Sequence, residues 1–181
     1  MNRFFLFLFL AVPLIHLRAQ TLPKNDPLKF DADYYLMEKE FDKARNNYLT
    51  ILKSEPENAD MKYKLGICYL NSENEKAKAI PYLEEAVQKV SEKYNPSSFK
   101  ETNAPVDALF LLGSAYRVNN ELDKAIDAYS RYKELLDPRD DYNQQVISQY
   151  ISSCHLAREM QNKPVGLIAV NLGGKINTSA P

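Results

Sequence analysis

The chain has 181 residues, of which 45% are hydrophobic and 26% are charged, and its formal net charge at pH 7 is −1. A length of this order suffices for one domain, and the balanced charge excludes the basic surface that nucleic-acid-binding domains present. We therefore expect one folded unit and no nucleic-acid partner.

The N-terminus has the pattern of a cleaved secretory signal peptide. Arg3 supplies the positive end, and residues 4–15 form an apolar run that is too short for a bilayer, which takes about 20 helical residues. Ala19 is the expected cleavage residue, with Leu17 an imperfect match at the −3 position, so residues 1–19 would be removed. No Cys follows the apolar run, which argues against a lipoprotein anchor. The alternative is an uncleaved anchor.

Beyond a lead-in at residues 20–27, apolar periodicity and turn residues predict seven helices. Pro56, Asn58 and the 71–74 segment separate the first four of them. The expected helices span residues 28–38, 41–54, 58–71, 75–93, 103–118, 121–136 and 140–162.

An inserted loop is expected at residues 94–104, between the fourth and fifth helices. Its Asn95-Pro96-Ser97-Ser98 run has the composition of a loop rather than of a helix. A loop in this place is either a binding element or a spacer between neighbouring helix pairs. We favour the spacer.

One pattern recurs three times in these helices. A Tyr lies near the end of a first helix, an Ala lies early in the second, and a large apolar residue follows that Ala by four positions. Ala at such a crossing lets helix axes approach to about 8–10 Å, and Gly66 and Gly113 do the same from the first helix. The Tyr recurs after 34 residues and then after 47, which is one period plus an insertion of 13. The copies are Tyr35-Ala44-Tyr48, Tyr69-Ala79-Leu83 and Tyr116-Ala125-Tyr129.

These residues resemble the tetratricopeptide repeat, whose pattern also includes the Leu65-Gly66 and Leu112-Gly113 pairs. The match has departures, because Asp31 stands where the family has Leu, and Ile51 and Tyr132 stand where it has Ala. The resemblance implies an all-α, superhelical solenoid of about three helix hairpins, since one hairpin cannot bury its apolar stripe alone. It gives a repeat region at residues 28–139, with repeats at about 25–58, 59–93 and 106–139.

The last two segments differ from the repeats. Residues 140–162 carry apolar side chains at steps of three and four without a second-helix partner, which predicts a capping helix over the last repeat. Residues 163–181 predict an extended tail. Within it, residues 170–178 resemble the start of a β-propeller in bacterial envelope proteins that also carry tetratricopeptide repeats and an OmpA-like peptidoglycan-binding domain. The alternative is an ordinary tail.

Candidate catalytic and metal-binding residues are scarce in the sequence. The two histidines are His16, in the signal peptide, and His155. Cys154 directly precedes His155, and successive helical residues point about 100° apart, so the two cannot form a nucleophile–base pair. No Cys/His set has zinc-ligand spacing, and no glycine-rich phosphate loop occurs. We expect no catalysis, cofactor, metal or small-molecule substrate, and no disulfide between Cys68 and Cys154.

The resemblance places partner binding in the concave groove that the first helices of the repeats line. The family's clamp for a peptide carboxylate needs Lys and Asn at groove positions that here hold Asp33, Ile67 and Ser114, so that clamp is absent. The apolar groove centre suits an extended or helical segment. The alternative is that the chain's own terminal helix or tail covers Tyr63, Ile67, Leu70 and Phe110. The expected groove residues are Lys29, Asp33, Leu36, Tyr63, Ile67, Leu70, Phe110, Ser114 and Arg117.

These patterns together predict a non-enzymatic interaction scaffold in the periplasm, associated with the outer membrane. Its expected partners are other proteins of an outer-membrane or periplasmic complex, such as secretion, gliding or outer-membrane biogenesis machinery. Peptidoglycan would be bound only through a further C-terminal domain. The alternatives are a periplasmic chaperone-like binder of extended client segments and the targeting module of a larger extracytoplasmic enzyme.

Overall fold

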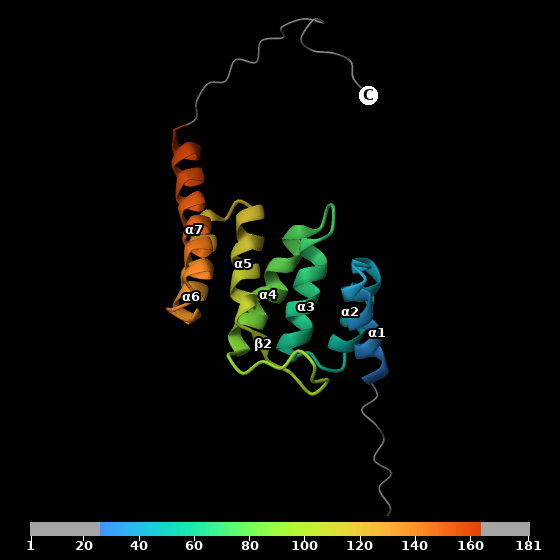
Figure 1. The fold of residues 1–181 in the computed structure, drawn as a ribbon. Coiled ribbons are helices and arrows are strands. Elements are labelled where there is room, and N and C mark those ends of the chain that lie inside the picture. Colours follow the sequence, from blue (N-terminus) through green and yellow to red (C-terminus); the bar gives the residue numbers. More distant parts are fainter. Residues whose placement is uncertain (1–25, 164–181) are drawn as a thin grey trace, which may run out of the picture.

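The computed structural model describes residues 26–163, which form a row of antiparallel α-helices stacked side by side (Figure 1). The predicted signal peptide and nearly all of the predicted extended tail lie outside these residues. The α-helices described are α1 (Asp26–Met37), α2 (Phe41–Leu52), α3 (Ala59–Leu70), α4 (Ala79–Ala86), α5 (Asp107–Val118), α6 (Leu122–Leu135) and α7 (Asp141–Asn162). The short elements described are the 3₁₀ helices η1 (Lys76–Lys78) and η2 (Val87–Lys89) and the strands β1 (Val90–Ser91) and β2 (Ala104–Pro105).

Within each hairpin the two helices cross closely at small residues. A Cβ added to Gly66 would lie 2.5 Å from Leu83 Cδ2, and one added to Gly113 would lie 2.5 Å from Tyr129 Cδ1. The three repeat alanines, Ala44, Ala79 and Ala125, are all 0% exposed. The predicted crossing points are therefore confirmed, and they hold the large apolar residue of the second helix against the first.

The turns inside the hairpins explain their spacing. Lys39 (φ 59°) and Asn120 (φ 64°) adopt the left-handed conformation between α1 and α2 and between α5 and α6. At each of these turns the chain reverses within a few residues. Asn is among the non-glycine residues that tolerate the left-handed conformation best. Repeat two instead reverses through residues 71–75 and η1, which accommodate its longer inter-helix turn.

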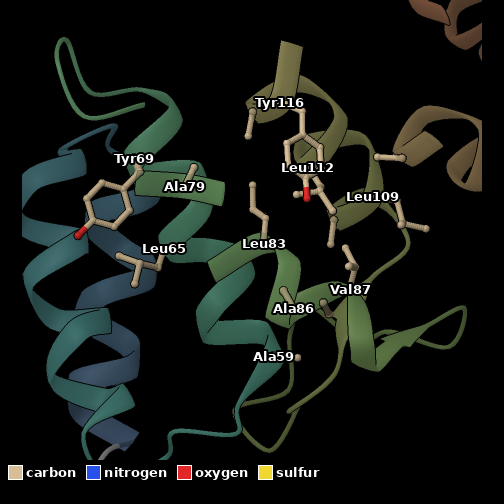
Figure 2. Close-up of a cluster of buried hydrophobic side chains, with 14 of the residues drawn as sticks. Ala59, Leu65, Tyr69, Ala79, Leu83, Ala86, Val87, Leu109, Leu112 and Tyr116 are labelled. Atoms are coloured by element: carbon tan, nitrogen blue, oxygen red, sulfur yellow. The ribbon is translucent and has the colours of Figure 1, made fainter. Parts of the chain in front are cut away.

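The hairpins stack in register to form one continuous core. The second helix of each hairpin packs on the first helix of the next, so that α2 contacts α3, α4 contacts α5, and α6 contacts α7. Figure 2 shows the junction of repeats two and three, where Leu83 and Val87 face Leu109 and Leu112. The helix α7 buries Ile147 and Cys154 at a spacing of seven, which is one face of a helix. The predicted all-α solenoid with a capping helix is thus confirmed.

The fourth helix is shorter than predicted. We expected it to span residues 75–93, but α4 ends at Ala86 and the chain passes through η2 into β1. Val90 and Ser91 pair in parallel with Ala104 and Pro105, so tertiary pairing overrides local helix propensity at this point. The fifth helix likewise begins at Asp107 rather than at residue 103, because a residue before Pro disfavours the helical conformation.

Candidate partner-binding groove

The inserted loop packs back across the first two repeats. Residues 92–103 join β1 to β2, and the Thr102 carbonyl oxygen accepts from the Ala59 N–H at 2.8 Å, at the start of α3. The Glu101 carboxylate accepts backbone N–H groups from Asn95, Thr102 and Asn103 at 2.9–3.2 Å, which holds the loop in one shape. These N–H donors lower the pKa of Glu101. The segment thus makes specific contacts in addition to separating two repeats.

The loop closes one end of the expected groove at Lys29. This residue is only 6% exposed. Its Nζ lies 2.9 Å from Glu55 Oε2 and donates to the Phe99 carbonyl oxygen at 3.3 Å. Lys29 therefore holds α1 to the inserted loop, and it does not present a free charge to a partner.

A buried polar network lies next to Lys29. Lys64 Nζ lies 2.9 Å from Asp33 Oδ1 and 3.0 Å from Asp60 Oδ2, while the Tyr48 hydroxyl donates to Asp33 at 2.7 Å. The Tyr94 hydroxyl, from the loop, donates to Asp60 at 2.6 Å. Burial raises the pKa of Asp60, although Lys64 and Tyr94 oppose that rise. The network joins α1, α2, α3 and the loop, so Asp33 has an internal structural role.

The other end of the groove is an aromatic cluster that includes the capping helix. The Phe110 ring centroid lies 5.6 Å from that of Tyr129, 5.7 Å from that of Tyr132 and 5.2 Å from that of Tyr150, the last in an edge-on arrangement. Tyr150 belongs to α7, and the Arg117 guanidinium lies over its ring at 5.4 Å. The interpretation in which the terminal helix covers the groove is therefore correct for Phe110.

The neighbours of this cluster also have partners inside the chain. Ser114 Oγ and the Tyr129 hydroxyl lie 3.1 Å apart and share a hydrogen bond. Burial, reinforced by the charge of Asp107, raises the pKa of the half-buried Tyr63 to about 12. Tyr63 thus lies half-buried near the carboxylates of Asp107 and Asp60.

Besides Tyr63 and Phe110, three apolar groove residues are half-buried and so keep part of their surface open. These residues are Leu36, Ile67 and Leu70. Arg117, the last of the predicted groove residues in the sequence, is exposed. These four residues come from α1, α3 and α5. They lie between the inserted loop and the contact of Phe110 with Tyr150 of α7. The open stretch is therefore shorter than the nine residues predicted, and its apolar part is contributed mainly by α3.

The two cysteines of the described residues are poorly suited to nucleophilic chemistry. Burial raises the pKa of the Cys68 thiol to about 12 and also raises that of Cys154, so both are poor nucleophiles, and both are free. Cys154 is buried whereas His155 is exposed, as their helical positions predict. Within residues 26–163, no three His, Cys, Asp or Glu side chains gather as a metal site would need. No helix of that stretch combines the length and the apolar character of a membrane span.

Sequence reasoning missed two residues that shape the groove. Lys64 lies four positions after Asp60 on α3, a spacing at which opposite charges meet on one helix face, so its ion pair could have been predicted. Tyr94 carries no such signal, because its contact with Asp60 spans 34 residues and depends on the path of the loop.

The arrangement of helices defines the class of protein: a solenoid of helix hairpins whose first helices line one surface. A comparison with protein families gives a match to Tetratricopeptide repeat at residues 25–94 and 100–141. The chain therefore belongs to the tetratricopeptide repeat family, whose members are modules for protein–protein interaction. The gap in the match at residues 95–99 falls within the inserted loop.

A solved structure supports the fold. The Sgt2 TPR domain from Aspergillus fumigatus aligns with a TM-score of 0.54 and 18% identity over 87% of this chain and 94% of that one. The MamA protein aligns at 22% identity over 80% of this chain and 98% of that one, with a TM-score of 0.34 that supports no inference. A search of curated proteins finds no match.

Proposed function

We propose that this protein is a non-catalytic scaffold of the bacterial cell envelope that binds another protein through the open stretch of its groove. The observation that carries the proposal is the half-buried apolar surface of Leu36, Ile67 and Leu70, bounded by the inserted loop and by the exposed Arg117. Apolar side chains flanked by polar groups suit an extended or helical segment of a partner, since such anchors dominate interface energies.

The proposed location rests on the N-terminal sequence. A basic residue followed by a 12-residue apolar run is the composition of an export signal, which supports a periplasmic chain that begins at Gln20. An outer-membrane complex is the proposed destination, and peptidoglycan contact would require a further domain. N-terminal sequencing of the native protein tests export, and recovery of intact Met1 in a cytosolic fraction would contradict it.

The groove is tested by replacing Ile67 with Thr and Leu70 with Gln in one variant. Val118→Thr serves as the matched control, because Val118 is a 52% exposed aliphatic residue outside the predicted groove. Both proteins are expressed in the native host, cross-linked, and compared for identified envelope proteins recovered per folded molecule. We expect the groove variant to lose most of that recovery, and the control to keep it.

Two results would favour the alternatives. Equal recovery with the groove variant would remove the groove from partner binding. Recovery of many unrelated unfolded polypeptides, all lost together in the groove variant, would favour the chaperone-like binder. The polar network of Asp33, Asp60 and Lys64 favours the scaffold, because a surface for many clients has little use for charges fixed inside the fold.

A further inference from the structure

The outward face of α1 carries an exposed apolar stripe, in which Tyr34 makes an edge-on ring contact with its neighbour Tyr35. Phe30 is 60% exposed, Tyr34 is 52% exposed and Met37 is 80% exposed. Residues spaced by four and by three lie on one face of a helix, so the three side chains form one continuous surface. Ala32, on the opposite face of α1, is 0% exposed and packs in the core.

The register of the repeats shows what this face does elsewhere in the chain. Tyr34 corresponds to Cys68 in α3 and to Ala115 in α5, which are 0% and 1% exposed. These positions are buried because each first helix packs on the second helix of the hairpin before it. In α7, Cys154 is buried on α6 in the same way. The centre of the stripe, Tyr34, therefore lies where this architecture receives a helix, whereas the counterparts of Met37, which are Asn71 and Val118, stay exposed.

Charge indicates the chemistry of the helix that would fit. Asp31 and Glu38 are exposed and seven residues apart, so they lie along one edge of the stripe. Neither has an ion pair within residues 26–163. The basic residue of α1, Lys29, is already buried against Glu55. Lys43 of α2 lies near the same edge, over the Tyr35 ring at 5.1 Å, but it is paired with Glu40, so Asp31 and Glu38 leave the edge acidic.

We infer that α1 docks an amphipathic, basic helix of another protein. Its apolar side chains cover Phe30, Tyr34 and Met37, and its flanking Lys or Arg residues pair with Asp31 and Glu38. The docked helix takes the place that α2 takes against α3, so the solenoid gains one helix from a second chain. This face of α1 differs from the one that carries Lys29 and Leu36, so the inference stands independently of the groove.

Synthetic peptides test this inference directly. The probe is a labelled helical peptide of about 14 residues, the length of α6, with Leu at steps of three and four and Lys along both edges. A matched peptide has Glu in place of every Lys. Binding to the purified chain, in its full form and in the form that begins at Gln20, is measured by fluorescence anisotropy. We expect the Lys peptide to bind about tenfold or more tightly than the Glu peptide, because complementary edge charges decide such preferences.

Variants assign the binding to α1. Tyr34→Ser combined with Met37→Ser should weaken binding of the Lys peptide by about tenfold or more, since exposed apolar anchors are lost. Asp31→Lys combined with Glu38→Lys should reverse the preference between the two peptides. The control is Leu156→Ser with Met160→Ser, which are 58% and 56% exposed on α7 and should leave binding unchanged. Circular dichroism melts check that every variant is folded.

Several outcomes would overturn the inference. Equal binding of the Lys peptide to the original chain and to the Tyr34/Met37 variant would place the site elsewhere. A dimer in sedimentation experiments that the same variant abolishes would assign the face to a second copy of this chain. Binding only after residues 1–19 are removed would assign it to the chain's own N-terminal segment. Loss of peptide binding in the Ile67/Leu70 variant would assign it to the groove.

Discussion

The close helix crossing in repeat three gives the sharpest test of the packing. We consider Gly113→Ala, because a Cβ there would lie 2.5 Å from Tyr129 Cδ1, 2.6 Å from Cε1 and 2.9 Å from Cγ. These atoms belong to a rigid ring that is 0% exposed and whose hydroxyl is hydrogen-bonded to Ser114. The ring cannot move aside alone, so the two helices must separate or the Tyr129–Ser114 contact must break.

The expected magnitude follows from two opposing effects. Overpacking of a dense core destabilises by about 1–3 kcal/mol, whereas Ala in a helix interior is more favourable than Gly by about 1 kcal/mol. Because the ring is rigid, we expect the overpacking cost of Gly113→Ala to lie toward the upper end of that range. The free energy of unfolding should then fall by about 1–2 kcal/mol in total. Gly66→Ala is the matched comparison, because its Cβ would meet the side-chain end of Leu83, which can change rotamer more easily.

The assay is urea unfolding followed by circular dichroism, with the slope of the transition checked to be unchanged. We expect the midpoint of Gly113→Ala to fall below that of Gly66→Ala, and both variants to remain helical. A Gly113→Ala protein at least as stable as the original chain would refute the reasoning, because it would mean that α5 and α6 are not held at this distance by the missing side chain.

Three further predictions concern the core, the cap and the loop. Ala125→Leu should lower the free energy of unfolding by about 1–3 kcal/mol, while exposed Glu134→Ala should change it by no more than about 0.5 kcal/mol, as urea midpoints will show; equal midpoints would contradict the register of repeat three. Phe110→Ala should destabilise by about 2 kcal/mol, since the ring is only half-buried, and calorimetry should record a lower Tm; an unchanged Tm would mean that the contact with Tyr150 contributes little. The pKa of Glu101 is lower in the folded chain than its ordinary value of 4.5. The stability that its carboxylate gives to the loop is therefore fully present above pH 4.5 and is lost as the pH falls through the pKa of the folded state. Hydrogen exchange of the loop should therefore separate Glu101→Gln from the original chain near pH 7, and the difference should shrink in acid; a constant difference would exclude that carboxylate as the cause.

The helix hairpins could be predicted from the sequence because their signals are local. Ala44, Ala79 and Ala125, and the large residue four positions after each, repeat within a period that one hairpin spans, and turn residues separate the helices. Such patterns depend on the helical repeat of 3.6 residues and on the size of single side chains. The fold class, the register of the repeats and the capping helix can therefore be predicted from local sequence patterns, without knowledge of long-range contacts.

Only the tertiary structure decided which groove residues remain open. Lys29 meets Phe99 across 70 residues, and Tyr94 meets Asp60 across 34, so both contacts depend on the path of an inserted loop that has no periodic pattern. The early end of α4 has the same cause, since β1 pairs with a strand that lies beyond the loop. Sequence periodicity specifies the face that a residue occupies on its own helix. The segment that comes to cover that face is specified by contacts between distant parts of the chain.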